Sequence, residues 1–198
     1  MRGTQPATDP PPIAPLTLSD GVVAARPWQM GDAPALYEAA RESIDTVGPW
    51  LPWLDDLYSI EDAERWVTDS QQHWVRQSEF RFMVHDAVTG RLLGGAGLNH
   101  LNQTHRFANL GYWVRASATG AGVASRAAKL VARFGLTTAG LGRIEILTVP
   151  SNLASQRVAT KIGATFEGEL RDRLLVRGMR SAARIYSLTR ADLEGSLR

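Results

Sequence analysis

The alternation of apolar and polar positions divides the chain into short strands and amphipathic helices. Alternating or continuous apolar runs predict strands, whereas apolar residues three and four positions apart predict helices that bury one face. The expected strands are Val22–Pro27, Phe80–Asp86, Arg91–His100, Ala108–Val114, Arg143–Val149, Phe166–Val176 and Ala182–Leu188. The expected helices are Asp32–Ser43, Ser59–Arg76, Val123–Phe134 and Ser151–Ile162. This order, in which two helices cross over between strands, predicts a mixed α/β sheet.

Residues 1–16 differ from the rest of the chain in composition. They include five prolines, which favour an extended polyproline conformation and leave little apolar surface to bury. We therefore expect residues 1–16 to form a flexible tail. The remaining residues, 17–198, are enough for one well-packed domain and few for two.

The overall composition is that of an ordinary globular protein, with 44% hydrophobic and 21% charged residues. No apolar run approaches the ~18 residues of a membrane span, and the N-terminal residues lack the apolar core of a secretory signal. We therefore expect a cytoplasmic protein with no membrane partner. Because the chain has no cysteine, a disulfide, a thiolate metal site and a cysteine nucleophile are excluded, and we expect no metal.

The net charge of +2 is too small to indicate a nucleic-acid-binding protein, and we expect no direct nucleic-acid partner. Basic residues nevertheless gather near the C-terminus. They are Arg171, Arg173, Arg177, Arg180 and Arg184. Such a cluster could attract an acidic partner, the ribosome or the phosphates of a cofactor. A solvated surface is the favoured interpretation, because the chain uses 20 arginines against 2 lysines.

The segment Asn109–Phe134 carries the strongest chemical signal. An aromatic strand leads through a glycine-rich turn into an amphipathic helix. Gly120 and Gly122 allow the backbone to turn sharply, and the free N–H groups of the following helix favour an anion. The sequence therefore predicts a site for a phosphorylated cofactor.

Two other phosphate-binding motifs fit this turn poorly. A Walker A loop requires a lysine after its last glycine, where this chain has Val123. A dinucleotide fingerprint requires a glycine where the chain has Ser125, and its ribose-binding acid would be Glu145, which lies within a predicted strand rather than at its end.

Three stretches around the turn share the motifs of a known family. They are Leu110–Val114 (LGYWV), Gly120–Ala124 (GAGVA) and Pro150–Gly168, the last with Asn152, Ser155, Lys161, Ile162 and Gly163 at the family's spacing. On these motifs the chain resembles the GNAT superfamily of acyl-coenzyme A (CoA) dependent N-acetyltransferases, and within it the ribosomal-protein N-terminal acetyltransferases. The resemblance covers about residues 16–188.

The resemblance implies a sheet whose central strands, Asn109–Val114 and Ile144–Val149, splay apart to admit acetyl-CoA. It implies backbone polarisation of the thioester near Trp113 and Val114. The implied cofactor-binding residues are Trp113, Val114, Thr119, Gly120, Ala121, Gly122, Val123, Ala124, Ser125 and Asn152. Ser155, with Asn152, is the implied catalytic residue, and its hydroxyl would hydrogen-bond the departing thiolate.

The chain departs from the family pattern at three positions. Thr119 replaces a usual Gln or Arg, Asn109 replaces a usual Glu, and Leu174 lies where a carboxylate base is sometimes invoked. No strong general base is therefore apparent. The further candidates are His100, His105, Glu42 and Glu145. An amine of low pKa is partly neutral at pH 7 and depends least on a base to remove its proton. We therefore expect the acceptor to be an amine such as a protein N-terminal α-amine.

Several alternatives stay open at this stage. Asn152 could only cap its helix, Ser155 could face solvent, and Tyr112 and Trp113 could fill the core or line an acyl pocket. Trp50 and Trp53 could shape the acceptor site or a homodimer contact. The protein could instead be a non-catalytic CoA-binding module, or it could transfer another acyl group such as succinyl to a peptide or a small molecule.

Overall fold

The computed structural model describes residues 16–195, so of the predicted tail only Leu16 is described. Within these residues eight strands form one sheet in the order β1-β2-β3-β4-β5-β6-β8-β7. The strands are β1 (Leu18–Ser19), β2 (Val23–Pro27), β3 (Phe80–Asp86), β4 (Leu92–Asn102), β5 (Phe107–Val114), β6 (Arg143–Thr148), β7 (Thr165–Val176) and β8 (Met179–Thr189). Among the described strands only β5 and β6 are parallel neighbours, which confirms the predicted mixed sheet.

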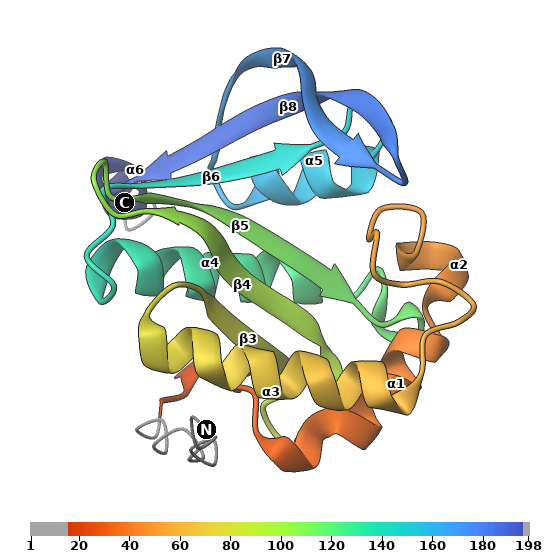
Figure 1. The fold of residues 1–198 in the computed structure, drawn as a ribbon. Helices are drawn as coiled ribbons and strands as arrows, with labels where there is room; N and C mark the ends of the chain where they lie inside the picture. Colours follow the sequence, from red (N-terminus) through yellow and green to blue (C-terminus); the bar gives the residue numbers. More distant parts are fainter. Residues whose placement is uncertain (1–15, 196–198) are drawn as a thin grey trace, which may run out of the picture.

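The sheet divides between β5 and β6. These strands pair at Phe107 with Arg143, at Ala108 with Ile144 and at Asn109 with Glu145, and then diverge. Figure 1 shows the resulting fork: β3, β4 and β5 form one arm, β6, β8 and β7 form the other, and the arms separate toward the carboxyl ends of β5 and β6. The expected splaying of the central strands is therefore confirmed.

Helices cover both faces of the sheet. They are α1 (Ala33–Arg41), α2 (Ile44–Val47), α3 (Ile60–Arg76), α4 (Val123–Thr137), α5 (Leu153–Lys161) and α6 (Arg190–Gly195). The crossover helix α4 packs against β2, β4 and β5, while α1 and α3 pack against each other and against the other face. No helix in residues 16–195 is both long and apolar enough to cross a membrane.

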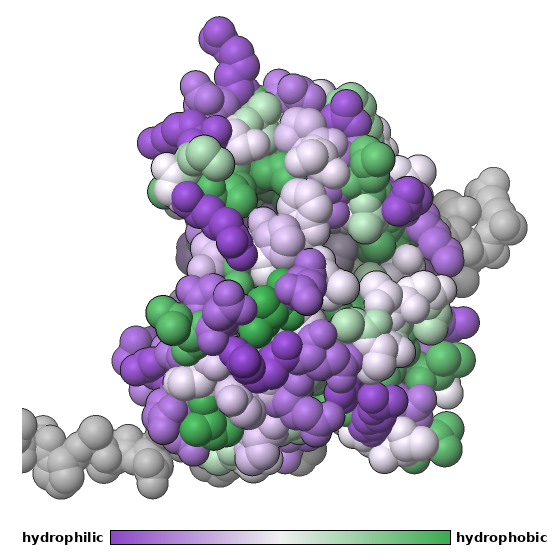
Figure 2. Space-filling model, turned by 90° about the vertical axis from the view of Figure 1, so that its right-hand side faces the viewer, coloured by the Kyte–Doolittle hydropathy of each residue, from purple (hydrophilic) through white to green (hydrophobic). Residues whose placement is uncertain are grey.

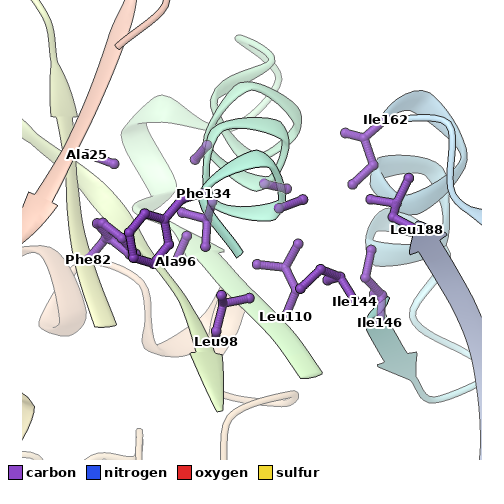
Figure 3. Packing of buried hydrophobic residues seen from close by; sticks show 14 of the residues in the cluster. Ala25, Phe82, Ala96, Leu98, Leu110, Phe134, Ile144, Ile146, Ile162 and Leu188 are labelled. Carbon is purple, nitrogen blue, oxygen red and sulfur yellow. The ribbon is translucent and has the colours of Figure 1, made fainter. Parts of the chain in front are cut away.

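Two apolar clusters follow from the alternation of side chains along the strands. Phe82 belongs to the larger cluster under α4, whereas the adjacent Met83 belongs to the cluster under α1 and α3. Figure 3 shows the larger cluster, in which Leu110 of β5 lies beside Ile144 and Ile146 of β6. Apolar packing therefore joins the two arms of the fork.

The structure adds short elements to the predicted set and shifts some boundaries. The elements β1, α2 and α6 are too short to produce a periodic pattern. The predicted helix Ser151–Ile162 is the observed α5, which begins at Leu153 because the side chain of Asn152 caps it. The expected cap of α3 is present, since Ser59 Oγ accepts from the N–H of Asp62 at 3.2 Å.

Candidate active site

A cavity of about 610 Å³ occupies the opening of the fork. Its walls come from the glycine turn (residues 119–125), β5, β6 and α5, and from the segment after α2 and the end of β7. Figure 2 looks onto the open end, where hydrophobic side chains lie in the hollow between two masses bordered by hydrophilic residues. The fork is therefore a lined cavity and not merely a gap between ribbons.

The glycine turn presents unpaired backbone N–H groups to this cavity. Gly120 and Gly122 have φ angles of +82° and +77°, which other residues adopt only with strain. Gly122 is the N-cap of α4, and among the described residues no side chain caps this helix. The first backbone hydrogen bond is donated by Arg126 to Gly122, so the N–H groups of residues 123–125 have no partner within the helix. This geometry favours an anion.

A buried arginine anchors the backbone that leads into the turn. Arg115, 4% exposed, forms ion pairs with Glu42 and with Glu38 (2.8 Å) at the end of α1. Glu42 also accepts from the N–H of Ser117 at 2.7 Å. The Arg115 guanidinium beside it lowers the pKa of Glu42 to about 2. Glu42 is therefore held as a structural carboxylate and is poorly suited to act as a base.

Two cations of α5 line the cavity, and one of them lies beside the turn. Arg157 and Lys161 lie one helical turn apart on α5, and both line the cavity. A Cβ added to Gly122 would lie 3.9 Å from Lys161 Nζ, so the ammonium group is next to the turn. No ion pair of Arg157 or Lys161 is formed among residues 16–195. Their charges add to the anion preference of the helix N-terminus.

The start of α5 brings a serine to the base of the fork. Asn152 Oδ1 accepts from the N–H of Ser155 at 3.0 Å, which is a helix-capping bond. Tyr112 of β5 reaches across the fork, and its Oη lies 3.0 Å from the carbonyl oxygen of Ser155 and 3.1 Å from Ser155 Oγ. Burial raises the pKa of Tyr112 to about 12, so the phenol keeps its proton at neutral pH.

The other end of the cavity is mainly apolar. Its lining residues there are Thr46, Val47, Trp50, Leu51, Pro52, Leu174, Leu175 and Val176. Arg177, in the turn between β7 and β8, donates to the carbonyl oxygen of Gly48 at 2.8 Å and ties this hairpin to the segment after α2. This end suits the uncharged part of a second ligand.

No Asp, Glu or His is among the described residues that line the cavity. The four base candidates His100, His105, Glu42 and Glu145 lie outside the lining, and Glu145 forms an ion pair with Arg143 at 2.9 Å. In the part of the chain that the structure describes, no group of three or more His, Asp or Glu could hold a metal ion.

The cavity brings together nearly all of the cofactor-binding and catalytic residues that the family resemblance implies. Those in the lining are Trp113, Val114, Thr119, Gly120, Gly122, Val123, Ala124, Ser125, Asn152 and Ser155. Ala121 is exposed and lies outside the lining. The Thr119 hydroxyl donates to the carbonyl oxygen of Ala116, so it is engaged within its own turn.

The two tryptophans of the predicted acceptor loop have different environments. Trp50 lines the cavity, but Trp53 packs between Trp66 and Trp113, with ring centroids 5.6 and 6.1 Å away. The acceptor role of Trp53 stays a prediction: its ring is half-buried and packs against the second apolar cluster. Sequence reasoning missed Arg157 and Lys161 as cavity residues, although the motif that includes Lys161 was recognised.

Comparisons with known proteins agree with this geometry. Residues 23–165 match the model of the acetyltransferase (GNAT) domain family. YdaF of Bacillus subtilis (strain 168), named as a candidate ribosomal N-acetyltransferase, is 28% identical over 166 residues, which are 83% of this chain and 89% of YdaF. Spermidine N(1)-acetyltransferase of Escherichia coli (strain K12) is 31% identical over 134 residues, which are 67% of this chain and 70% of that protein.

A solved structure gives the same result. RimJ of Mycobacterium smegmatis, in complex with CoA-disulfide, superposes with a TM-score of 0.79 at 25% sequence identity, covering 93% of this chain and 90% of RimJ. The family match spans most of the chain, and the overall fold superposes on that of RimJ. The chain therefore belongs to the GNAT family of N-acetyltransferases.

Proposed function

We propose that this enzyme transfers the acetyl group of acetyl-CoA directly to an uncharged primary amine, and that its preferred acceptor is a peptide or protein N-terminal α-amine. One observation carries the proposal: a single cavity joins an anion-binding helix N-terminus to an apolar chamber whose described lining has no carboxylate and no imidazole. The helix N-terminus suits the phosphates of the acyl donor, and the apolar chamber suits the amine acceptor.

The residues present fit acetyl-CoA. The unpaired N–H groups of residues 123–125, with Arg157 and Lys161 of α5, would hold its phosphates. Beyond Asn109 and Glu145 the facing edges of β5 and β6 no longer pair. Apart from the N–H of Leu147, which donates to Asn109 Oδ1, their backbone groups are therefore available to the amides of the pantetheine arm. When bound, acetyl-CoA supplies an activated acyl group with a thiolate as leaving group.

Val114 is the backbone donor best placed to polarise a carbonyl in the fork. Successive N–H groups of a strand point to opposite edges. The N–H of Arg115 donates to Leu93 of β4 at 2.9 Å, so the N–H of Val114 is directed to the other edge, toward β6. An N–H group in this position would stabilise negative charge on the acyl oxygen. This argument favours Val114 over Trp113 for that role.

Two features support direct attack by the amine. The chain has no cysteine that could carry the acyl group. Ser155 also lines the same cavity as the glycine turn and the apolar end, so donor and acceptor can meet beside it. We assign to the Ser155 hydroxyl a hydrogen bond to the departing thiolate, and to the cavity walls the alignment of the amine.

The lining discriminates between classes of amine. An α-amine with a pKa near 8 is about one-tenth neutral at pH 7, whereas a lysine amine with a pKa near 10.4 is neutral in about one molecule per few thousand. With no acid or imidazole in the described lining to remove a proton, the α-amine has the advantage. Spermidine, the substrate in the name of one relative, carries further positive charges that an apolar wall would not stabilise.

A thiol-release assay with acetyl-CoA tests the proposal. The acceptors are a lysine-free peptide with a free N-terminus, an N-terminally blocked peptide bearing one lysine, and spermidine. At pH 7 we expect the free N-terminus to give a kcat/KM at least about tenfold above the other two. Preference for lysine or spermidine would contradict the choice of acceptor. Tight acetyl-CoA binding without thiol release over a broad amine panel would instead indicate a non-catalytic CoA-binding protein.

A further inference from the structure

Tyr112 and Ser155 contact each other across the fork, although they lie 43 positions apart in the chain. Tyr112 lies on β5 beyond the last residue that pairs with β6, and Ser155 lies in the first turn of α5. Tyr112 Oη lies 3.0 Å from the carbonyl oxygen and 3.1 Å from the Oγ of Ser155, and both residues line the cavity. The contact therefore ties the two arms together at the site.

The hydrogen-bonding capacity of the two groups limits how they can pair. The phenol is protonated at neutral pH, because burial raises the pKa of Tyr112 to about 12. The carbonyl oxygen of Ser155 can only accept, and the hydroxyl can donate or accept. Ser155 Oγ has no other hydrogen-bond partner among the described residues. The phenol is therefore the group that selects one of the three staggered rotamers of Ser155.

We propose that Tyr112 is a positioning residue: its phenol O–H donates to Ser155 Oγ, rather than to the neighbouring carbonyl oxygen, and so holds the serine hydroxyl with its own proton free for the thiolate that departs during acetyl transfer. The inference rests on the proposed function, since it assigns the phenol a task in that same reaction. Tyr112 acts through Ser155 and not on the reacting atoms. Without the phenol the serine hydroxyl would sample all three rotamers, and fewer molecules would present it correctly as the thiolate forms.

A double-mutant cycle tests the inference. The variants are Tyr112→Phe, Ser155→Ala and the double substitution, assayed for thiol release with acetyl-CoA and a peptide bearing a free N-terminus. Tyr112→Phe should lower kcat about five- to tenfold and change the KM for acetyl-CoA by less than about twofold. In the Ser155→Ala background, Tyr112→Phe should have no further effect, because its target is absent.

The matched control is Tyr186→Phe. Tyr186 lies on β8, is buried in the larger apolar cluster, and neither lines the cavity nor forms a hydrogen bond with Ser155 among the described residues. Its variant should retain the wild-type kcat. The inference is overturned if Tyr112→Phe leaves kcat unchanged, if its effect lies wholly in KM, or if the losses of the two single variants multiply in the double variant.

A second measurement does not depend on the folding of Tyr112→Phe. Fluorotyrosine in place of Tyr112 keeps the phenol, and its fluorine resonance reports the surroundings of the hydroxyl. Ser155→Ala should shift this resonance, and an unchanged resonance would overturn the inference. Failure of the proposed function would give a different result, because the wild-type enzyme itself would then release no thiol with any amine.

Discussion

The side-chain carbonyl oxygen of Asn109 accepts a hydrogen bond from the backbone N–H of Leu147 at 3.2 Å, at the point where β5 and β6 part. The amide nitrogen of Asn109 donates to Asn99 Oδ1 of β4 at 2.8 Å. One side chain thus satisfies a strand N–H that lost its partner when the sheet opened and also links to the neighbouring strand.

Replacing Asn109 should therefore lower the free energy of unfolding more than replacing an asparagine in an ordinary turn. Asn109→Ala leaves the N–H of Leu147 and the side-chain oxygen of Asn99 without these partners, and we expect a loss of about 2 kcal/mol in the free energy of unfolding. The control is Asn102→Ala, which removes a bond to His105 in an exposed turn and should cost about 1 kcal/mol or less. Urea unfolding measures both, and equal losses would contradict this role.

The glycine turn allows a test that separates backbone strain from ligand binding. Gly120 and Gly90 both have positive φ angles, +82° and +72°, and at both an added Cβ would meet open space. Ala at either position should destabilise the fold by about 1 kcal/mol. Only Gly120→Ala should also weaken acetyl-CoA binding, by about tenfold in isothermal titration. Equal affinities of the two variants would exclude the turn from the cofactor site.

Lys161 should contribute to the affinity for acetyl-CoA through its charge. Lys161→Gln should raise the dissociation constant about fivefold at low salt, and the difference should shrink as salt is added. Lys129→Gln is the matched control, since Lys129 is exposed on α4 and lies outside the cavity. A Lys161 variant that binds acetyl-CoA like the wild type at low salt would contradict the assignment.

The ion pair of Glu42 with Arg115 should give stability a defined pH dependence. The pKa of Glu42 falls from 4.5 to about 2 in the folded protein, so the carboxylate stabilises the fold fully above pH 4.5. This contribution declines as the pH falls from 4.5 to about 2 and is absent below. Glu42→Gln should therefore cost about 2 kcal/mol at pH 7 and little at pH 2.

The free energy of unfolding of the wild type, Glu42→Gln and the control Glu64→Gln, measured from about pH 2 to pH 7, checks this expectation. Glu64 is exposed on α3 and has no ion pair among residues 16–195, so its variant should follow the wild type throughout. A difference between wild type and Glu42→Gln that stays constant with pH would show that the carboxylate charge is not responsible.

Local patterns in the sequence were sufficient to predict most of the helices and strands. The strand Phe80–Asp86 has the predicted bounds, and the cap at Ser59 sets the start of α3, because strand alternation and capping depend on neighbouring residues. The glycine turn was recognised for the same reason. The prediction that β5 and β6 part came only from the family resemblance, because the order of strands in a sheet depends on residues distant in the chain.

Contacts between distant segments could not be predicted from the sequence. The pairing of Tyr112 with Ser155 and the approach of Lys161 to Gly122 exist only because α5 packs beside the fork. Trp53 has the same local pattern as Trp50, and only the positions of Trp66 and Trp113 determine that its ring packs against the second apolar cluster. Side-chain identity indicated the chemistry, whereas tertiary packing decided which residues share the cavity.

A crystal structure of the enzyme with CoA tests the central claim most directly, because it locates the cofactor independently of any acceptor. We expect the diphosphate on the backbone N–H groups of residues 122–125 and the pantetheine arm between β5 and β6, with its sulfur near Ser155. A diphosphate bound elsewhere, or strands β5 and β6 joined along their length with no ligand between them, would contradict the account.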